Sequence, residues 1–156
     1  MEVLYIVALQ MPREAAWDRL VSATGFSSPS THVRVTMTKG NWPEEGAEGY
    51  FEFRTPEKIP ARTSFTIRES MPGERLSFHL AHGALHGTAM DILVNEPTPG
   101  ESVVTGIIGG LGNPAHRTKD ARGKYLPTPR QRRAETALRG FLDTAMNPVE
   151  GITERN

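Results

Sequence analysis

A chain of 156 residues has the size of one domain and can bury about 70% of its unfolded surface, enough for a hydrophobic core. It has no cysteine, which excludes disulfides, thiolate chemistry and zinc fingers but does not indicate a compartment. Its 18 Lys and Arg balance 18 Asp and Glu, yet residues 115–139 hold eight of the former and two of the latter. A segment of net charge +6 therefore belongs to a body of net charge −6.

The N-terminal residues do not have the pattern of a secretory signal. The chain opens with Met1 and Glu2, without a basic region, and no small-residue cleavage site follows the apolar run at residues 4–9. No apolar stretch reaches the ~18 residues that a membrane-spanning helix needs. We therefore expect a soluble cytoplasmic protein in which residues 1–156 form a single domain.

The first two elements are expected to be a strand and a short helix. Residues 2–9 are apolar on both parities and rich in β-branched and aromatic side chains, which is typical of a strand covered on both faces. From Pro12 the apolar spacing becomes helical, with Trp17 flanking the apolar positions, and Gly25 closes the run. This pattern predicts a helix of about three turns, followed by a loop at residues 26–31.

From Thr31 the apolar period drops to two and stays there over six segments separated by turn sequences, the last of them Val103–Ile108. Each segment has one apolar parity, which predicts an antiparallel meander with an apolar concave face and a polar convex face. On the convex face we expect ion pairs across strands, such as Glu52 with Arg62. The residues whose parity points to the concave face are Val33, Val35, Met37, Phe51, Phe53, Thr63, Phe65, Ile67, Leu76, Phe78, Leu80, His86, Thr88, Met90, Ile92 and Val94.

The last predicted element is a longer helix over residues 128–146. Thr128 can cap its start, Pro129 suits its first position, and Asn147-Pro148 ends it. One apolar stripe runs along it and must be buried against another element, for which the sheet is available. The stripe consists of Ala134, Leu138, Phe141, Leu142 and Ala145. The expected fold class is therefore α+β, a seven-stranded curved antiparallel sheet wrapped around the C-terminal helix.

The order strand, helix, six strands, long helix resembles the helix-grip fold of the SRPBCC superfamily, which includes START lipid-transfer domains, birch-pollen-allergen-like proteins and polyketide cyclase/dehydratases. The resemblance covers essentially the whole chain. It also rests on P-x-x-x-x-W at residues 12–17, P-G-E-R-L-S-F at residues 72–78, and G-T-A-M-D-I-L-V-N-E-P followed by G-E-S-V-V-T at residues 87–105. These features are specific for the fold and weak for function. The chain departs from the usual pattern of this superfamily in two places. The second small helix that normally follows the first is hardly visible, and the link at residues 109–127 is unusually long.

The resemblance implies a cavity between the concave face and the long helix. Apolar walls with few polar anchors would suit a small hydrophobic molecule, polyketide-like or aromatic. The same side chains could instead pack solidly, and Trp42 could be a packing anchor instead of a side chain at the cavity mouth. The expected ligand contacts are Phe51, Phe53, Phe65, Ile67, Phe78, Met90, Ile92, Leu138, Phe141 and Leu142, with Trp42 at the mouth.

Two polar residues are candidates for catalysis. His86 is the only titratable side chain that the alternation turns inward, and Thr88 follows on the same face. A histidine near its ordinary pKa can act as general acid or base, and a threonine can orient it or the substrate. The alternative is a histidine that is hydrogen-bonded at a strand start or exposed in the hairpin. Although His79, His82 and His86 form H-x-x-H-x-x-x-H, we expect no metal, because the alternation sends His79 to the convex face.

These candidates leave several functions open. For an enzyme, the resemblance implies cyclisation, dehydration or a related conversion that needs no cofactor, with His86 as the first candidate for proton transfer. The competing function is a non-catalytic carrier or sensor with the same cavity, and the nearly apolar concave face favours it. A third is a protein-interaction module that uses the basic segment. Monomer and homodimer are both compatible with the sequence.

The link at residues 109–127 combines glycines at its start with basic residues in its middle. One interpretation is a lid over the cavity mouth that recruits an anionic ligand or carrier, or an acidic partner. Partial disorder is another. We do not expect nucleic acid, because the segment has one aromatic residue and no stacking array. The residues concerned are Arg117, Lys119, Arg122, Lys124 and Tyr125, followed by Arg130, Arg132 and Arg133, whose charges oppose the dipole of the last helix.

Overall fold

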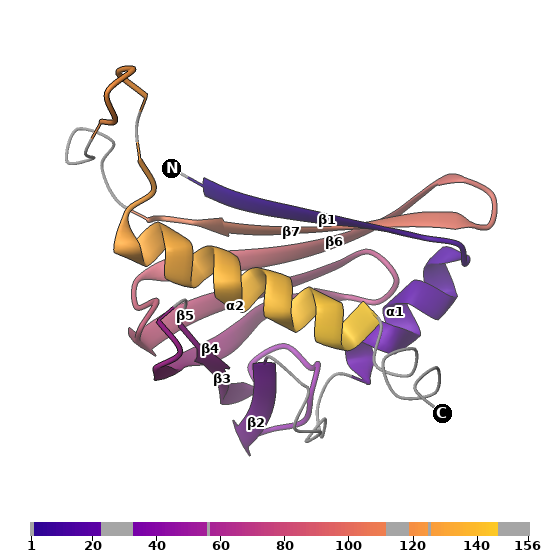
Figure 1. Ribbon diagram of the computed structural model, residues 1–156. Helices are drawn as coiled ribbons and strands as arrows, with labels where there is room; N and C mark the ends of the chain where they lie inside the picture. The colour runs from indigo at the N-terminus through magenta and orange to yellow at the C-terminus, as the bar shows by residue number, and fades with distance from the viewer. Residues whose placement is uncertain (1, 23–32, 56, 112–118, 125, 147–156) are drawn as a thin grey trace, which may run out of the picture.

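The computed structural model describes residues 2–22, 33–55, 57–111, 119–124 and 126–146. In these ranges it has the predicted order of strand, helix, six strands and long helix (Figure 1). The elements are β1 (Glu2–Leu9), α1 (Arg13–Val21), β2 (Val33–Lys39), β3 (Glu48–Arg54), β4 (Pro60–Met71), β5 (Arg75–Gly83), β6 (Thr88–Thr98), β7 (Glu101–Gly109) and α2 (Pro129–Met146). None of these helices is both long enough and apolar enough to span a membrane.

All seven strands belong to one antiparallel sheet with the order β1-β7-β6-β5-β4-β3-β2. Strands β2 to β7 form the predicted meander. β1 pairs with β7 in an unbroken register from Glu2 opposite Gly109 to Leu9 opposite Ser102, so β1 and β2 are the two edge strands. Figure 1 shows α2 lying along the concave face of this curved sheet. The predicted α+β helix-grip architecture is confirmed.

α2 begins and packs as its sequence predicts. The Thr128 hydroxyl accepts a hydrogen bond from the Gln131 N–H at 3.0 Å, which caps the first turn. Leu138 and Leu142 are fully buried against the sheet. At Gly106 of β7 an added Cβ would lie 2.6 Å from Leu138 Cδ1 and 2.8 Å from Leu142 Cδ1. The side chains of α2 therefore pack onto the backbone of β7 at Gly106, where any other residue would force them to move.

α1 closes one end of the molecule. Ala16 and Leu20 are fully buried, and the Arg19 guanidinium donates to the Met146 carbonyl at the end of α2. The Glu96 carboxylate accepts hydrogen bonds from the Gly100 and Arg13 N–H groups, each at 2.8 Å. These two bonds lower the pKa of Glu96. One carboxylate thus joins the β6–β7 hairpin to the start of α1.

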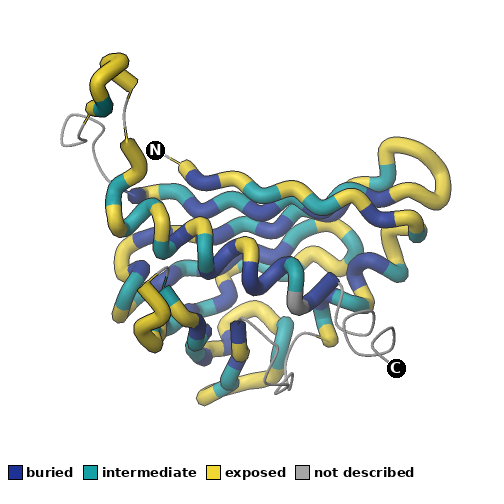
Figure 2. Tube along the Cα trace, in the orientation of Figure 1, coloured by how far each residue is buried: buried dark blue, intermediate teal, exposed yellow. Residues whose placement is uncertain are grey.

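The prediction that β1 is covered on both faces was wrong. Val3 and Leu9 point inward and are buried, whereas Leu4 and Ile6 on the opposite parity are 53% and 56% exposed. Within the sheet, Leu4 lies opposite Ile107 of β7 and Ile6 lies opposite Thr105. Figure 2 shows buried and exposed positions alternating along the strands. An edge strand can therefore be apolar on both parities without being covered on both faces.

Candidate functional site

Five aromatic rings meet between the concave face and α2, and we call them the aromatic cluster. Three come from neighbouring strands, one from α2 and one from the β2–β3 loop. The centroid separations of contacting rings run from 4.5 Å for the stacked pair Phe51 and Phe65 to 6.4 Å for Phe78 and Phe141. The aromatic cluster consists of Trp42, Phe51, Phe65, Phe78 and Phe141.

Trp42 reaches the aromatic cluster because its loop folds back over the concave face. The Gly46 N–H donates to the Ile67 carbonyl at 2.8 Å, and the Ile67 N–H donates to the Ala47 carbonyl at 2.9 Å, so the loop is fastened to β4. The indole then stacks on Phe78 at 5.7 Å and meets Phe141 edge-on at 6.2 Å. Trp42 is half-buried, and it connects the β2–β3 loop with both walls of the interior.

The ten predicted ligand contacts on the sheet and α2 are all buried, none more than 4% exposed. Their inward orientation is therefore confirmed, while their contact with a ligand stays a prediction. In the aromatic cluster the rings of the sheet touch Phe141 of α2 directly, through Phe51 at 5.4 Å and through Phe78. Side chains thus fill the space between sheet and helix at this place, as the solid-packing alternative expects.

The buried polar side chains of the described residues are four hydroxyls. Each of them already donates a hydrogen bond. Thr63 donates to the His82 carbonyl at 2.9 Å, Thr88 to the Leu85 carbonyl at 2.7 Å, Ser102 to the Met11 carbonyl at 2.7 Å, and Ser77 to Asp91 at 2.5 Å. Because a hydroxyl has one proton to donate, the donor capacity of all four is taken up in holding the fold.

A polar contact between β1 and α2 was missed by the sequence analysis. The Tyr5 hydroxyl donates to Asp143 at 2.7 Å, and the Arg139 guanidinium lies over the Tyr5 ring at 4.8 Å. The hydrogen bond to Asp143, with help from partial burial, raises the pKa of Tyr5. Tyr5 lies on the same side of β1 as the buried Val3, and this alternation could have indicated that its side chain points inward.

Comparison with known proteins supports this architecture. A START superfamily protein from Mycobacterium smegmatis is 10% identical, with a TM-score of 0.66 over 97% of this chain and 99% of its own. Ara h 8.0201 is 10% identical, with a TM-score of 0.64 over 97% and 98%. An AHSA1-like protein from Aeromonas hydrophila is 18% identical, with a TM-score of 0.59 over 97% and 93%. The chain has a helix-grip fold.

The similarity to these helix-grip proteins is one of fold, because the identities are low. No family model matches the sequence, and no curated protein matches it significantly. A fold of this kind can host unrelated functions on the same framework. The function must therefore be argued from the side chains of this chain.

The inward orientation predicted for His86 was wrong. β5 continues to Gly83, which has a φ of 94°, and β6 begins at Thr88, so His86 lies in the turn between them, where strand alternation does not apply. The side chain is exposed, with its Nδ1 3.2 Å from the Gly83 carbonyl oxygen, and Leu85 occupies the buried position instead. Thr88 is buried as predicted. The catalytic roles of both residues stay predictions.

The histidines of β5 and the basic residues of the link are not part of the aromatic cluster. Within the described ranges no three His, Asp or Glu side chains are grouped to hold a metal, and His79 is half-buried whereas His82 is exposed. In the basic link of this helix-grip protein, Asp120 accepts from the Arg122 and Lys124 N–H groups at 2.8 and 2.9 Å. Figure 1 shows this turn standing away from the sheet and α2.

Part of the proposed lid cannot be placed. Arg117 and Tyr125 lie outside the described residues. Lys119, Arg122 and Lys124 are exposed. At the start of α2, the Arg130 guanidinium donates to the His86 carbonyl, so this arginine links the helix to the β5–β6 turn. The lid and the anion contact stay predictions.

Proposed function

We propose that this helix-grip protein binds a small, mostly hydrophobic molecule between the concave face and α2, at the aromatic cluster. The observation that supports the proposal is the convergence of five rings from the sheet, the helix and a loop on one place. Aromatic faces favour planar apolar ligands, and each well-placed ring pair contributes about 0.5 to 1.5 kcal/mol beyond area burial. A polyketide-like or other aromatic molecule fits this chemistry.

Trp42 is the part of the wall that would move to admit the molecule. The four phenylalanines are at most 3% exposed and belong to strands or α2, whereas Trp42 is half-buried and belongs to a loop. Positive φ angles of 73° at Gly40 and 89° at Gly46 lie on either side of it. Rotation of the indole off Phe78 would uncover that ring, and a planar ligand would replace one ring–ring contact with another.

Binding without chemistry, as a carrier or sensor, is the form of the proposal that the interior supports best. The protons of the four buried hydroxyls are already donated within the protein, and His86 is exposed in its turn. Proton transfer in a buried site needs a group within hydrogen-bond reach of the substrate. The aromatic cluster itself offers packing surface and one indole N–H.

A second candidate is a cofactor-free cyclase or dehydratase in small-molecule biosynthesis. The pair of Tyr5 and Asp143 favours it, because this hydroxyl and carboxylate form an acid–base couple on the inner side of β1. Replacing Tyr5 by Phe and His86 by Gln, singly, separates the two candidates. In an enzyme one replacement should abolish turnover of a bound substrate and spare its binding. Unchanged turnover in both variants would remove these residues from the mechanism.

Trp42 fluorescence tests the binding proposal directly. The chain has two tryptophans, so Trp17→Phe leaves Trp42 as the single reporter. Titration of that variant with 2-acetylnaphthalene should change the Trp42 emission in a saturable way, because the ligand replaces Phe78 as the neighbour of the indole. Native mass spectrometry of the purified protein should show a co-purified small molecule. A probe that binds without changing Trp42 emission would place its site elsewhere, and absence of binding in both experiments would refute the proposal.

A further inference from the structure

The indole N–H of Trp42 is buried and has no hydrogen-bond partner among the described residues. An indole nitrogen can only donate, so nothing but an acceptor can satisfy it. Leaving such a group unpaired in the interior costs about 1 to 3 kcal/mol, and buried tryptophans usually find a partner. Packing alone does not explain the choice of residue, because a phenylalanine would pack there without this cost.

The surroundings of Trp42 are consistent with the lack of an acceptor among the described residues. Its ring neighbours in the aromatic cluster are the phenylalanines Phe65, Phe78 and Phe141, which have no acceptor atoms. Two carbonyls of its own loop, those of Asn41 and Glu44, accept instead from the Glu44 N–H at 2.7 Å and from the Ala47 N–H at 3.1 Å. Among the described residues the indole N–H is thus unpaired beside three apolar rings.

We infer that the ligand carries a neutral oxygen acceptor, such as a ketone carbonyl, which binds the Trp42 N–H while an apolar ring system lies against the aromatic cluster. This inference rests on the proposed function and specifies its ligand class. The acceptor is neutral because the aromatic cluster contains no cation to compensate a carboxylate, and the fully buried polar side chains among the described residues are hydroxyls. Burying an unpaired carboxylate would cost far more than one hydrogen bond returns.

Two probes of matched shape test the inference. 2-Acetylnaphthalene has a carbonyl, and 2-isopropylnaphthalene has nearly the same shape without one. Their dissociation constants are measured for the wild-type chain and for Trp42→Phe, which keeps an aromatic ring and removes the N–H. The ketone should lose about fivefold to tenfold in affinity in the variant, the size expected for one hydrogen bond. The hydrocarbon should change by less than about twofold, since no hydrogen bond is lost.

The control variant is Trp17→Phe, which changes the tryptophan of α1 and should leave both affinities unchanged. Equal losses of the two probes in Trp42→Phe would show that Trp42 only packs, so the inference would fail while ligand binding stood. Tighter binding of 2-naphthoate than of the ketone would overturn the neutral acceptor. Failure of both neutral probes to bind the wild-type chain would refute the proposed function together with the inference.

A second measurement needs no change at Trp42. In the 15N-labelled Trp17→Phe protein, Trp42 gives the single indole N–H signal in a heteronuclear NMR spectrum. Saturation with 2-acetylnaphthalene should move this proton downfield, because a hydrogen bond to oxygen deshields it, and 2-isopropylnaphthalene should not. The same shift with both probes would overturn the inference even if Trp42→Phe did not fold.

Discussion

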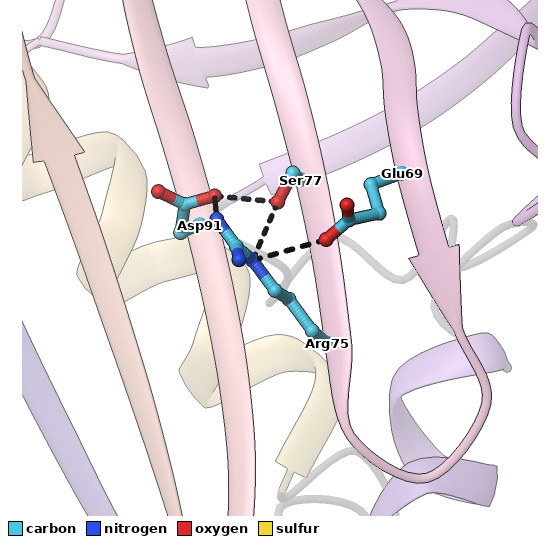
Figure 3. A network of polar contacts seen from close by, with 4 residues as sticks. All are labelled: Glu69, Arg75, Ser77 and Asp91. Carbon is cyan, nitrogen blue, oxygen red and sulfur yellow. Dashed lines mark hydrogen bonds and ion pairs between the residues drawn. The ribbon is translucent and has the colours of Figure 1, made fainter.

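The two faces of the sheet carry opposite chemistry on the same strands. On the concave side, Phe78 of β5 is 1% exposed and touches the other four rings of the aromatic cluster. One residue away on the convex side, Ser77 donates to Asp91 at 2.5 Å, and Arg75 joins both Asp91 and Glu69, at 3.2 and 3.5 Å (Figure 3). The rings on the concave side are shielded from water, whereas the polar network on the convex side is partly exposed to it.

This difference indicates where each face can contribute to stability and to binding. Apolar burial contributes about 25 cal/mol per Å², and ring contacts add to it. The side chains of Arg75 and Asp91 are 43% and 34% exposed, so solvent screens their attraction. A hydrophobic ligand is therefore expected on the concave side, and changes there should cost more than equivalent changes on the convex side.

Replacing Phe78 by Ala should produce the largest loss. It removes a buried ring with four aromatic neighbours and should lower the free energy of unfolding by about 3 to 5 kcal/mol. The control is Ile6→Ala on the convex face, which removes a side chain that is 56% exposed and should cost less than about 1 kcal/mol. Urea unfolding of the three proteins measures both losses. Comparable losses would contradict the distinction between the faces.

The glycines of β7 provide a comparison within one strand. In Gly106→Ala the new methyl group would meet Leu138 and Leu142 at 2.6 and 2.8 Å, so these buried side chains or α2 itself must shift, at a cost of about 1 to 3 kcal/mol. In Gly109→Ala the nearest atom outside the strand is Glu2 Cγ at 3.8 Å, an ordinary contact. We expect the free energy of unfolding of this control to differ from that of the wild-type chain by less than about 0.5 kcal/mol. Thermal and urea unfolding measure both losses, and a larger loss in Gly109→Ala than in Gly106→Ala would contradict the packing of α2 on Gly106.

The alternation of side chains within a strand explains how much of the fold and of the candidate site could be predicted from the sequence. Alternation correctly turned Phe51, Phe65 and Phe78 inward, and it set Glu52 opposite Arg62, where the predicted ion pair forms at 3.2 Å. The end of a strand is where the method fails. His86 was assigned by counting back from β6 into a turn, where successive side chains no longer alternate.

Contacts between distant parts of the chain could not be predicted from local pattern. Tyr5 and Asp143 are separated by 138 positions, and their meeting depends on how α2 crosses β1. The unpaired N–H of Trp42 depends on how the β2–β3 loop is fastened to β4. Local spacing specifies which face a side chain takes, whereas its partner across the interior follows only from the assembled fold.

The contact of Tyr5 with Asp143 should have an intermediate effect. Tyr5→Phe removes one half-buried hydrogen bond to a carboxylate and should cost about 1 kcal/mol at neutral pH. Because the folded state raises the pKa of Tyr5, this stabilisation is fully present below the ordinary pKa of 10.0 and is lost as the pH rises through the folded value. The difference between wild type and variant should therefore shrink above pH 10. A difference that grows with pH would contradict the assigned hydrogen bond.

The smallest effect is expected in the convex network of Figure 3. Arg75→Gln removes the charge and keeps donor groups, while the bond from Ser77 to Asp91 remains, so the loss should be below about 1 kcal/mol and should decrease at high salt. A double-mutant cycle of Arg75→Gln with Asp91→Asn should give a coupling energy near 0.5 kcal/mol, since both side chains are partly exposed. A coupling of several kcal/mol that persists at high salt would mean that the network is shielded from water. The convex face would then be a second buried surface, and the reason for assigning the ligand to the concave side alone would disappear.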